Sequence, residues 1–163
     1  YFNNSIMSMS AIAVIDNKKV KGYITFTQPK DKNYTMVKFN LKLPRKNSIF
    51  ACHLHEYGDL RNGCTSLGSH WNPTKVQHGS HLHHKKHHYG DMINNIKSDK
   101  NGNFTYSYKD KLLRLRGKNH IFGRSIVIHD KPDDMGLGGD KESLITGNAG
   151  KRIAHGIIVH YKT

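Results

Sequence analysis

The chain has 163 residues and a mass of 18.6 kDa, a length that suits one domain with a single core. It has 26 lysines and arginines against 12 acidic residues, a net charge of +14, but no basic helix or nucleic-acid motif accompanies these cations. We therefore expect a solvated basic surface and no specific nucleic acid partner. No apolar run reaches membrane-spanning length, so no membrane association is predicted.

The N-terminal residues 1–8 are expected to be an extension or a remnant of cloning. No initiator methionine precedes Tyr1, while Met7 and Met9 follow shortly afterwards. The folded domain is expected over residues 9–163, without an internal repeat or an interdomain linker.

Three runs along the chain alternate apolar and polar residues with the period of two that is typical of β strands. Turn-forming residues punctuate them at Asp16-Asn17, at 99–102 and at 116–119. Short strands in this rhythm predict an all-β antiparallel sandwich or barrel. The apolar members of the three runs are Val20, Ile24 and Phe26; Val37, Phe39, Leu41 and Leu43; and Phe104, Tyr106 and Tyr108.

A pair of histidines, His53 and His55, stands at alternate positions of a further strand-like run. Side chains two residues apart on a strand share a face, so the two imidazoles can bind one divalent ion, with copper or zinc favoured. A histidine at the end of an apolar strand, His129, follows later in the chain.

A long segment from Gly58 to about Tyr89 contains most of a second group of potential ligands. Three imidazoles and one carboxylate make the closed tetrahedral set of a structural zinc site. Long segments without regular structure in a compact domain are usually functional or disordered, and a metal would order this one. The four residues are His70, His78, His88 and Asp91.

At these residues the chain resembles the copper/zinc superoxide dismutases. The resemblance runs from about Met9 to the end of the chain. It implies an all-β fold, an eight-stranded Greek-key β-barrel of the immunoglobulin-like sandwich type with two long functional loops. The second of these loops, from Asp130 to about Ile153, would cover a channel to the copper. The densest matches are HLHEYGD, GCTSLGSHWNP, HYGD, GRSIVIH, DDMGLGG and TGNAGKRIAHG.

The resemblance also implies the site residues. Arg152 would guide the anion, and Asp133 would tie the two metal sites together from behind the ligands. His70 would be shared as a bridging imidazolate. The implied ligands are His53, His55, His70 and His129 for copper, and His70, His78, His88 and Asp91 for zinc.

The function implied by the resemblance is the disproportionation of superoxide to oxygen and hydrogen peroxide, with copper cycling between two oxidation states. A homodimer is implied on the same ground. With no leader segment visible, a cytoplasmic setting is expected, in the host cytoplasm or the virion if the source is viral. Two alternatives stay open: a homologue that binds copper and zinc without catalysis, and a binder of nucleic acid or membrane surfaces supported only by the charge.

Two features of the histidines and cysteines depart from the family pattern. A tract with further histidines makes the third zinc histidine ambiguous. His87 is an alternative to His88, because the interval from His78 to His88 is one residue longer than expected. The other histidines of the tract are His81, His83 and His84. The family joins the residue matching Cys64 to a second cysteine near the C-terminus, where this chain has His155. We expect Cys52 and Cys64 to be free thiols, although a bridge between them stays open.

A third departure falls in the second long loop. There, Lys141 and Ile145 replace an expected acidic residue and an expected lysine. The family's usual pattern of electrostatic guidance is therefore not expected in full.

Overall fold

The computed structural model describes residues 8–82 and 86–162, and eight strands account for most of its regular structure. Residues 1–7 of the predicted extension, and His83 and His84 of the histidine tract, lie outside these ranges. The strands are β1 (Met9–Asp16), β2 (Lys21–Gln28), β3 (Thr35–Lys42), β4 (Ile49–His55), β5 (Asn95–Lys97), β6 (Asn103–Asp110), β7 (Ser125–His129) and β8 (Arg152–His160).

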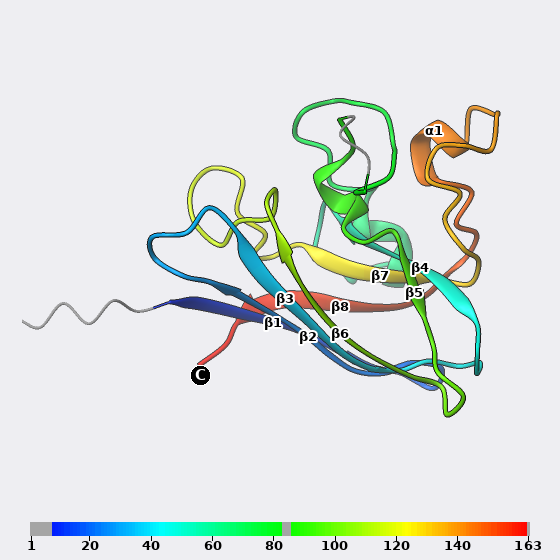
Figure 1. Ribbon diagram of the computed structural model, residues 1–163, viewed down its shortest axis with the longest axis horizontal. Coiled ribbons are helices and arrows are strands. Elements are labelled where there is room, and N and C mark those ends of the chain that lie inside the picture. Colours follow the sequence, from blue (N-terminus) through cyan, green and yellow to red (C-terminus); the bar gives the residue numbers. More distant parts are fainter. Residues whose placement is uncertain (1–7, 83–85, 163) are drawn as a thin grey trace, which may run out of the picture.

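The strands form a nearly closed antiparallel barrel in the order β5-β4-β7-β8-β1-β2-β3-β6, which confirms the all-β prediction (Figure 1). β4 leaves its chain neighbour β3 and pairs with β7, so the chain crosses from one half of the barrel to the other. Helical structure in the described ranges is limited to η1 (Gly63–Leu67), η2 (Tyr89–Asp91) and α1 (Ser143–Thr146). None of these helices is long and apolar enough to cross a membrane.

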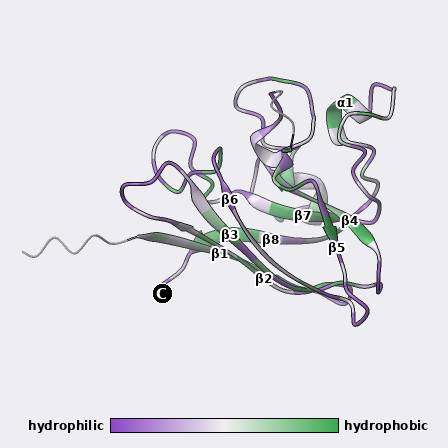
Figure 2. Ribbon diagram, viewed as in Figure 1, coloured by the Kyte–Doolittle hydropathy of each residue, from purple (hydrophilic) through white to green (hydrophobic). Residues whose placement is uncertain are grey.

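The core forms where the alternation of the sequence predicts it. Ile24 pairs with Phe39 and Phe26 with Val37 across β2 and β3, and all four side chains are buried. Burying one side chain of this size stabilises the fold by about 1.5–3 kcal/mol. Figure 2 shows hydrophobic residues along the strands and mostly hydrophilic residues in the loops.

The outermost strand β6 differs from the expectation. Tyr106 is 50% exposed, and the side chains of Phe104 and Tyr108 are only partly buried against the core. Among the strands of the described ranges, β6 ends the order and pairs with β3 alone. A terminal strand has a neighbour on one side only, so the alternation there predicts the strand but not full burial of its apolar face.

Two long loops lie on the same side of the barrel, above β4 and β7 (Figure 1). The first long loop, residues 56–94, connects β4 to β5 and contains η1 and η2. The second long loop, residues 130–151, connects β7 to β8 and contains α1. This placement covers the outer face of β4, which is why nearly every residue of that strand is buried.

Candidate metal centre

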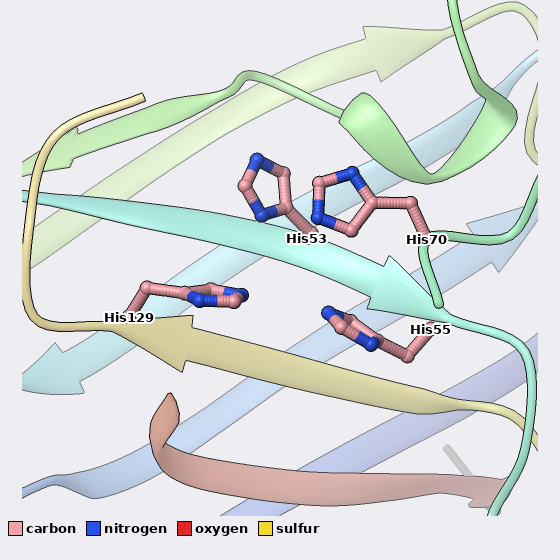
Figure 3. Close-up of side chains that lie close together, drawn as sticks. All are labelled: His53, His55, His70 and His129. Carbon is pink, nitrogen blue, oxygen red and sulfur yellow. The ribbon is translucent and has the colours of Figure 1, made fainter. Parts of the chain in front are cut away.

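Four histidines converge over the face of β4 that the loops cover, and we call them the first cluster. Figure 3 shows His53 and His55 from β4, His129 from β7 and His70 from the first long loop around one space. One ring nitrogen from each lies within 4.8 Å of the others, and all four side chains are buried.

The inward nitrogens of the first cluster have no hydrogen-bond partner in the described part of the chain. They are His53 Nδ1 and the Nε2 atoms of His55, His70 and His129. A buried polar atom without a partner costs free energy, and four of them meeting at one point call for a common partner. Four imidazole nitrogens in this arrangement fit a copper ion.

The other ring nitrogen of three of these histidines is held by an oxygen. His53 Nε2 lies 2.7 Å from Asp133 Oδ2, His55 Nδ1 2.9 Å from the Gly68 carbonyl, and His129 Nδ1 3.3 Å from the Gly150 carbonyl. Each oxygen accepts the ring proton, so the lone pair of the opposite nitrogen points into the cluster. This outer support is the usual way that proteins orient metal-binding imidazoles.

Backbone contacts bring the two distant histidines to β4. The first long loop folds back onto the end of β4, where His70 forms an isolated antiparallel β-bridge with His55. Beside it, the Trp71 amide donates to the Leu54 carbonyl at 2.8 Å. The register of β7 against β8 shifts between Ile128 and His129. Such irregularities re-aim a side chain at the end of a strand, which fits His129 turning toward β4.

Four residues make a second cluster, His70, His78, His88 and Asp91, which also lie within 4.8 Å of one another through one atom each. Asp91 Oδ1 lies 3.3 Å from His70 Nδ1, 2.8 Å from His78 Nδ1 and 3.1 Å from His88 Nδ1. Three nitrogens and one oxygen in a buried, closed set fit zinc. His70 therefore faces both clusters, with Nε2 toward the first and Nδ1 toward the second.

His88 and His87 lie differently. His88 Nδ1 faces Asp91, and it has no hydrogen-bond partner in the described part of the chain. The ring of His87 turns back, its Nδ1 lying 2.8 Å from the His88 carbonyl and 3.9 Å from Asp91 Oδ2. Gly90 lets the segment of His88 and Asp91 approach β4 closely, because a Cβ at position 90 would collide with the Leu54 carbonyl of β4.

Asp133 connects the two clusters from behind. Its Oδ2 lies 2.7 Å from His53 Nε2 and its Oδ1 lies 2.9 Å from His78 Nε2. Gly147, in the left-handed conformation at φ 67, approaches this carboxylate so closely that a Cβ there would collide with it. One carboxylate thus orients one ring of each cluster.

Asn94 was not predicted from the sequence, and it joins the two long loops. Its side-chain amide donates to Asp133 Oδ2 at 2.9 Å and to the Gly79 carbonyl at 3.0 Å. Its side-chain oxygen accepts from the His81 amide at 2.9 Å, so the described end of the histidine tract is tied to this residue. The only sequence signal is an asparagine soon after Asp91, in the left-handed conformation (φ 56) that asparagine tolerates.

Burial keeps the first cluster neutral. It lowers the pKa of His53 and of His129 to about 4. It lowers the pKa of His70 to about 3, and it also lowers the pKa of His55. Neutral imidazoles are the form that binds a metal, so the cluster needs no deprotonation at pH 7.

The second cluster has the opposite character, because carboxylates surround it. Burial alone would lower the pKa of His78, but hydrogen bonds to Asp133 and Asp91 raise it to about 9. Burial alone would raise the pKa of Asp91, but hydrogen bonds from the histidines hold it well below its usual range. A cation is therefore favoured at this position, whether as a proton on His78 or as a metal ion.

A pocket of about 410 Å³ opens onto the first cluster, and His55, His70 and His129 line it. Arg152 stands at its side, donating from Nη1 to the Cys64 carbonyl and from Nη2 to the Gly68 carbonyl, both at 2.6 Å. The second long loop supplies Lys131, Glu142 and Ile145 to the wall.

Both cysteines are free. Cys52 is fully buried in the barrel core, while Cys64 is partly exposed in η1. Cys64 Sγ lies 3.1 Å from His155 Nδ1, so this pair stands where the resemblance places the disulfide of the family.

Comparison with known proteins gives one consistent result. Residues 20–158 match the family model described as copper/zinc superoxide dismutase. A Cu-Zn superoxide dismutase of Paramecium bursaria Chlorella virus 1 is 45% identical over 98% of this chain and 82% of its own length. The enzyme of Humicola lutea is 42% identical over 92% and 97% of the two chains.

An extracellular Cu-Zn superoxide dismutase of Drosophila melanogaster is 42% identical, covering 93% of this chain and 86% of its own length. The crystal structure of the clock protein EA4 superposes with a TM-score of 0.88 at 34% identity, covering 99% of each chain.

Proposed function

Because this chain belongs to the copper/zinc superoxide dismutase family, we propose that the first cluster holds its catalytic copper and the second cluster its zinc. The family reaction converts superoxide into oxygen and hydrogen peroxide. The observation that carries the assignment is the set of four buried, partnerless imidazole nitrogens that meet at one point.

Bound copper supplies the one-electron exchange of the reaction, which zinc cannot supply because it has no second oxidation state. A side chain of the protein supplies the protons that the reduced substrate takes up. We assign that role to His70, because its Nε2 faces the first cluster while its Nδ1 lies 3.3 Å from Asp91 Oδ1. Held from the Nδ1 side, the ring can take up a proton at Nε2 and release it to the reduced substrate.

Arg152 binds and orients the incoming anion in this proposal. Two carbonyl oxygens hold its guanidinium beside His55 and His129, and one of them, that of Gly68, also accepts from His55. Lys131 adds a second cation to the pocket wall. The +14 net charge of the chain attracts small anions to the surface, while Arg152 selects the position beside the copper ligands.

Zinc is expected to use His88, because His88 Nδ1 faces Asp91 while His87 turns back to the backbone. His88→Ala should lower zinc content from one equivalent to near zero, whereas His87→Ala, the matched control, should retain zinc. Zinc per chain is measured by atomic emission after dialysis. Loss of zinc in His87→Ala but not in His88→Ala would reverse the assignment.

A homodimer is also part of the proposal, and its contact surface would include the segments around Tyr57-Gly58 and Gly123. Tyr57 is 56% exposed, and the ring of His160 stacks on Phe122 at 3.9 Å beside this surface. An isologous contact would bury the same patch on both copies.

Sedimentation at micromolar concentration should therefore show a dimer. Tyr57→Glu should shift it toward monomer, because like charges would meet across the two-fold axis. A wild-type protein that sediments only as monomer contradicts the dimer.

We also propose a cytoplasmic setting, supported by two free cysteines in a family whose members usually carry a disulfide. Fractionation of cells that express the protein from its own gene would test this. Recovery in the culture medium, as expected for the extracellular relative, would contradict it.

The decisive experiment for the whole proposal is superoxide consumption by protein loaded with copper and zinc. Activity far above that of the same amount of free copper supports the enzyme. Fully loaded protein without such activity would favour the alternative, a homologue that binds both metals without catalysis.

A further inference from the structure

The thiol of Cys64 and the imidazole of His155 form a pair outside the residues that line the pocket, but the Cys64 carbonyl accepts a hydrogen bond from Arg152, which does line it. Cys64 lies in η1 of the first long loop and His155 in β8, 91 residues apart, yet Sγ and Nδ1 are 3.1 Å from each other. Both side chains are partly exposed, and neither belongs to either metal cluster. The proposed dismutation makes no use of them.

We propose that Cys64 is a peroxide-sensitive thiol, oxidised to a sulfenic acid with His155 as the base that takes its proton. In this step the thiol proton moves to His155 Nδ1, and the sulfur attacks one oxygen of hydrogen peroxide. The S–O bond forms as the O–O bond breaks. The leaving hydroxide recovers the proton from His155 and departs as water, so a thiol and a peroxide give a sulfenic acid and water.

The division of roles rests on the 3.1 Å contact between Sγ and Nδ1, because both pKa shifts oppose the proton transfer and only a base in direct contact can assist it. Burial raises the pKa of Cys64, although the charge of Arg152 opposes that rise, so the thiol rests protonated and needs a base. Burial lowers the pKa of His155, so its imidazole is neutral and offers a free lone pair at Nδ1. A thiolate formed by transfer to His155 is the nucleophile that the reaction requires.

The other cysteine cannot complete a disulfide without unfolding the chain. Cys52 is fully buried in the barrel core, where burial raises its pKa to about 12. The sulfenic acid of Cys64 therefore has no partner within its own chain. A small thiol from solution is the reductant that restores it.

Oxidation of Cys64 would weaken anion binding at the active site by displacing Arg152. The guanidinium donates to the Cys64 carbonyl at 2.6 Å, and its other anchor, the Gly68 carbonyl, follows η1 directly. An added oxygen on Sγ must displace the 3.1 Å contact with His155, which moves η1 and loosens Arg152. The oxidised protein should then bind superoxide less well until a thiol reduces it.

Only the natural source of the peroxide rests on the proposed function, because hydrogen peroxide is the product of dismutation. An experiment with added peroxide separates the two ideas. Metal-loaded protein is treated with hydrogen peroxide and dimedone, and the sulfenic adduct is mapped by peptide mass spectrometry. Wild type should be labelled at Cys64 and not at Cys52.

The variant His155→Asn should be labelled on the order of tenfold or more slowly, because a positioned base is lost. Its melting temperature is recorded to show that it folds. Labelling of wild type that favours Cys52, or no adduct at all, would overturn the site. Equal labelling rates in wild type and folded His155→Asn would overturn the role of His155.

Activity provides the second readout. Peroxide can also damage copper ligands irreversibly, so the informative quantity is the part of the lost activity that dithiothreitol restores. Wild type should show such a reversible part, and Cys64→Ser should show none. A reversible part of equal size in Cys64→Ser would overturn the coupling to Arg152.

Discussion

Replacing His129 by alanine should abolish superoxide consumption. The substitution removes one of four convergent nitrogens and widens the pocket that His129 lines. Even the outer partners of metal-binding residues are worth about 10–100-fold in metal affinity or activity, so losing a direct ligand should cost at least about two orders of magnitude. Activity per chain and copper per chain are measured on the same sample.

The matched control is His120→Ala, which removes an exposed histidine outside both clusters. It should keep both copper and activity. If His129→Ala retained copper and consumed superoxide at the wild-type rate, the first cluster would not be the catalytic site. Activity that falls together with copper content would show that His129 acts by holding the metal.

Removing zinc should lower the melting temperature on the order of 10 °C. The proposed zinc ligands His70, His78, His88 and Asp91 all come from the first long loop, and no disulfide closes this loop. A metal that binds only the folded chain, at a thousandfold above its dissociation constant, adds about 4 kcal/mol. One kcal/mol shifts the melting temperature of a domain of this size by roughly 2–4 °C.

Two controls accompany the measurement. A reductant should change the melting temperature of the metal-loaded protein little, because Cys52 and Cys64 are both free. His78→Ala should make stability nearly independent of added zinc. A large drop caused by the reductant would show a structural disulfide, between these cysteines or between two chains, and would contradict the assignment of zinc as the main restraint on the loop.

The fold was predictable because its strands carry the signal locally. The alternation through Val37, Phe39 and Leu41 places these side chains on one face, and the structure buries that face in the core. The same rule put His53 and His55 on one side of β4 and Cys52 on the other. Tyr106 is exposed although the alternation places it on the apolar face of β6. Burial there depends on a neighbouring strand, and the outermost strand of the described order lacks one on one side.

The loop residues were predictable only as members of a family pattern. Adjacent histidines at 87 and 88 have the same chemistry, and only the fold-back of η2 against β4 turns His88 toward Asp91. Asn94 carries no motif of its own, yet it links His81, Gly79 and Asp133.

By itself, the sequence determined strands β2, β3, β4, β6 and β7, the chemical types of the candidate ligands and the absence of the family's second cysteine. Those properties depend on residue identity and on spacings of a few positions, which backbone geometry converts directly into faces and donors. Residue identity and local spacing did not show that His70 faces two clusters, that Asp133 spans both, or that Cys64 meets His155; the family resemblance implied these relations, and the tertiary structure forms the contacts. These contacts join residues as far as 91 positions apart, and only the closure of the barrel and the packing of both long loops over β4 bring them together.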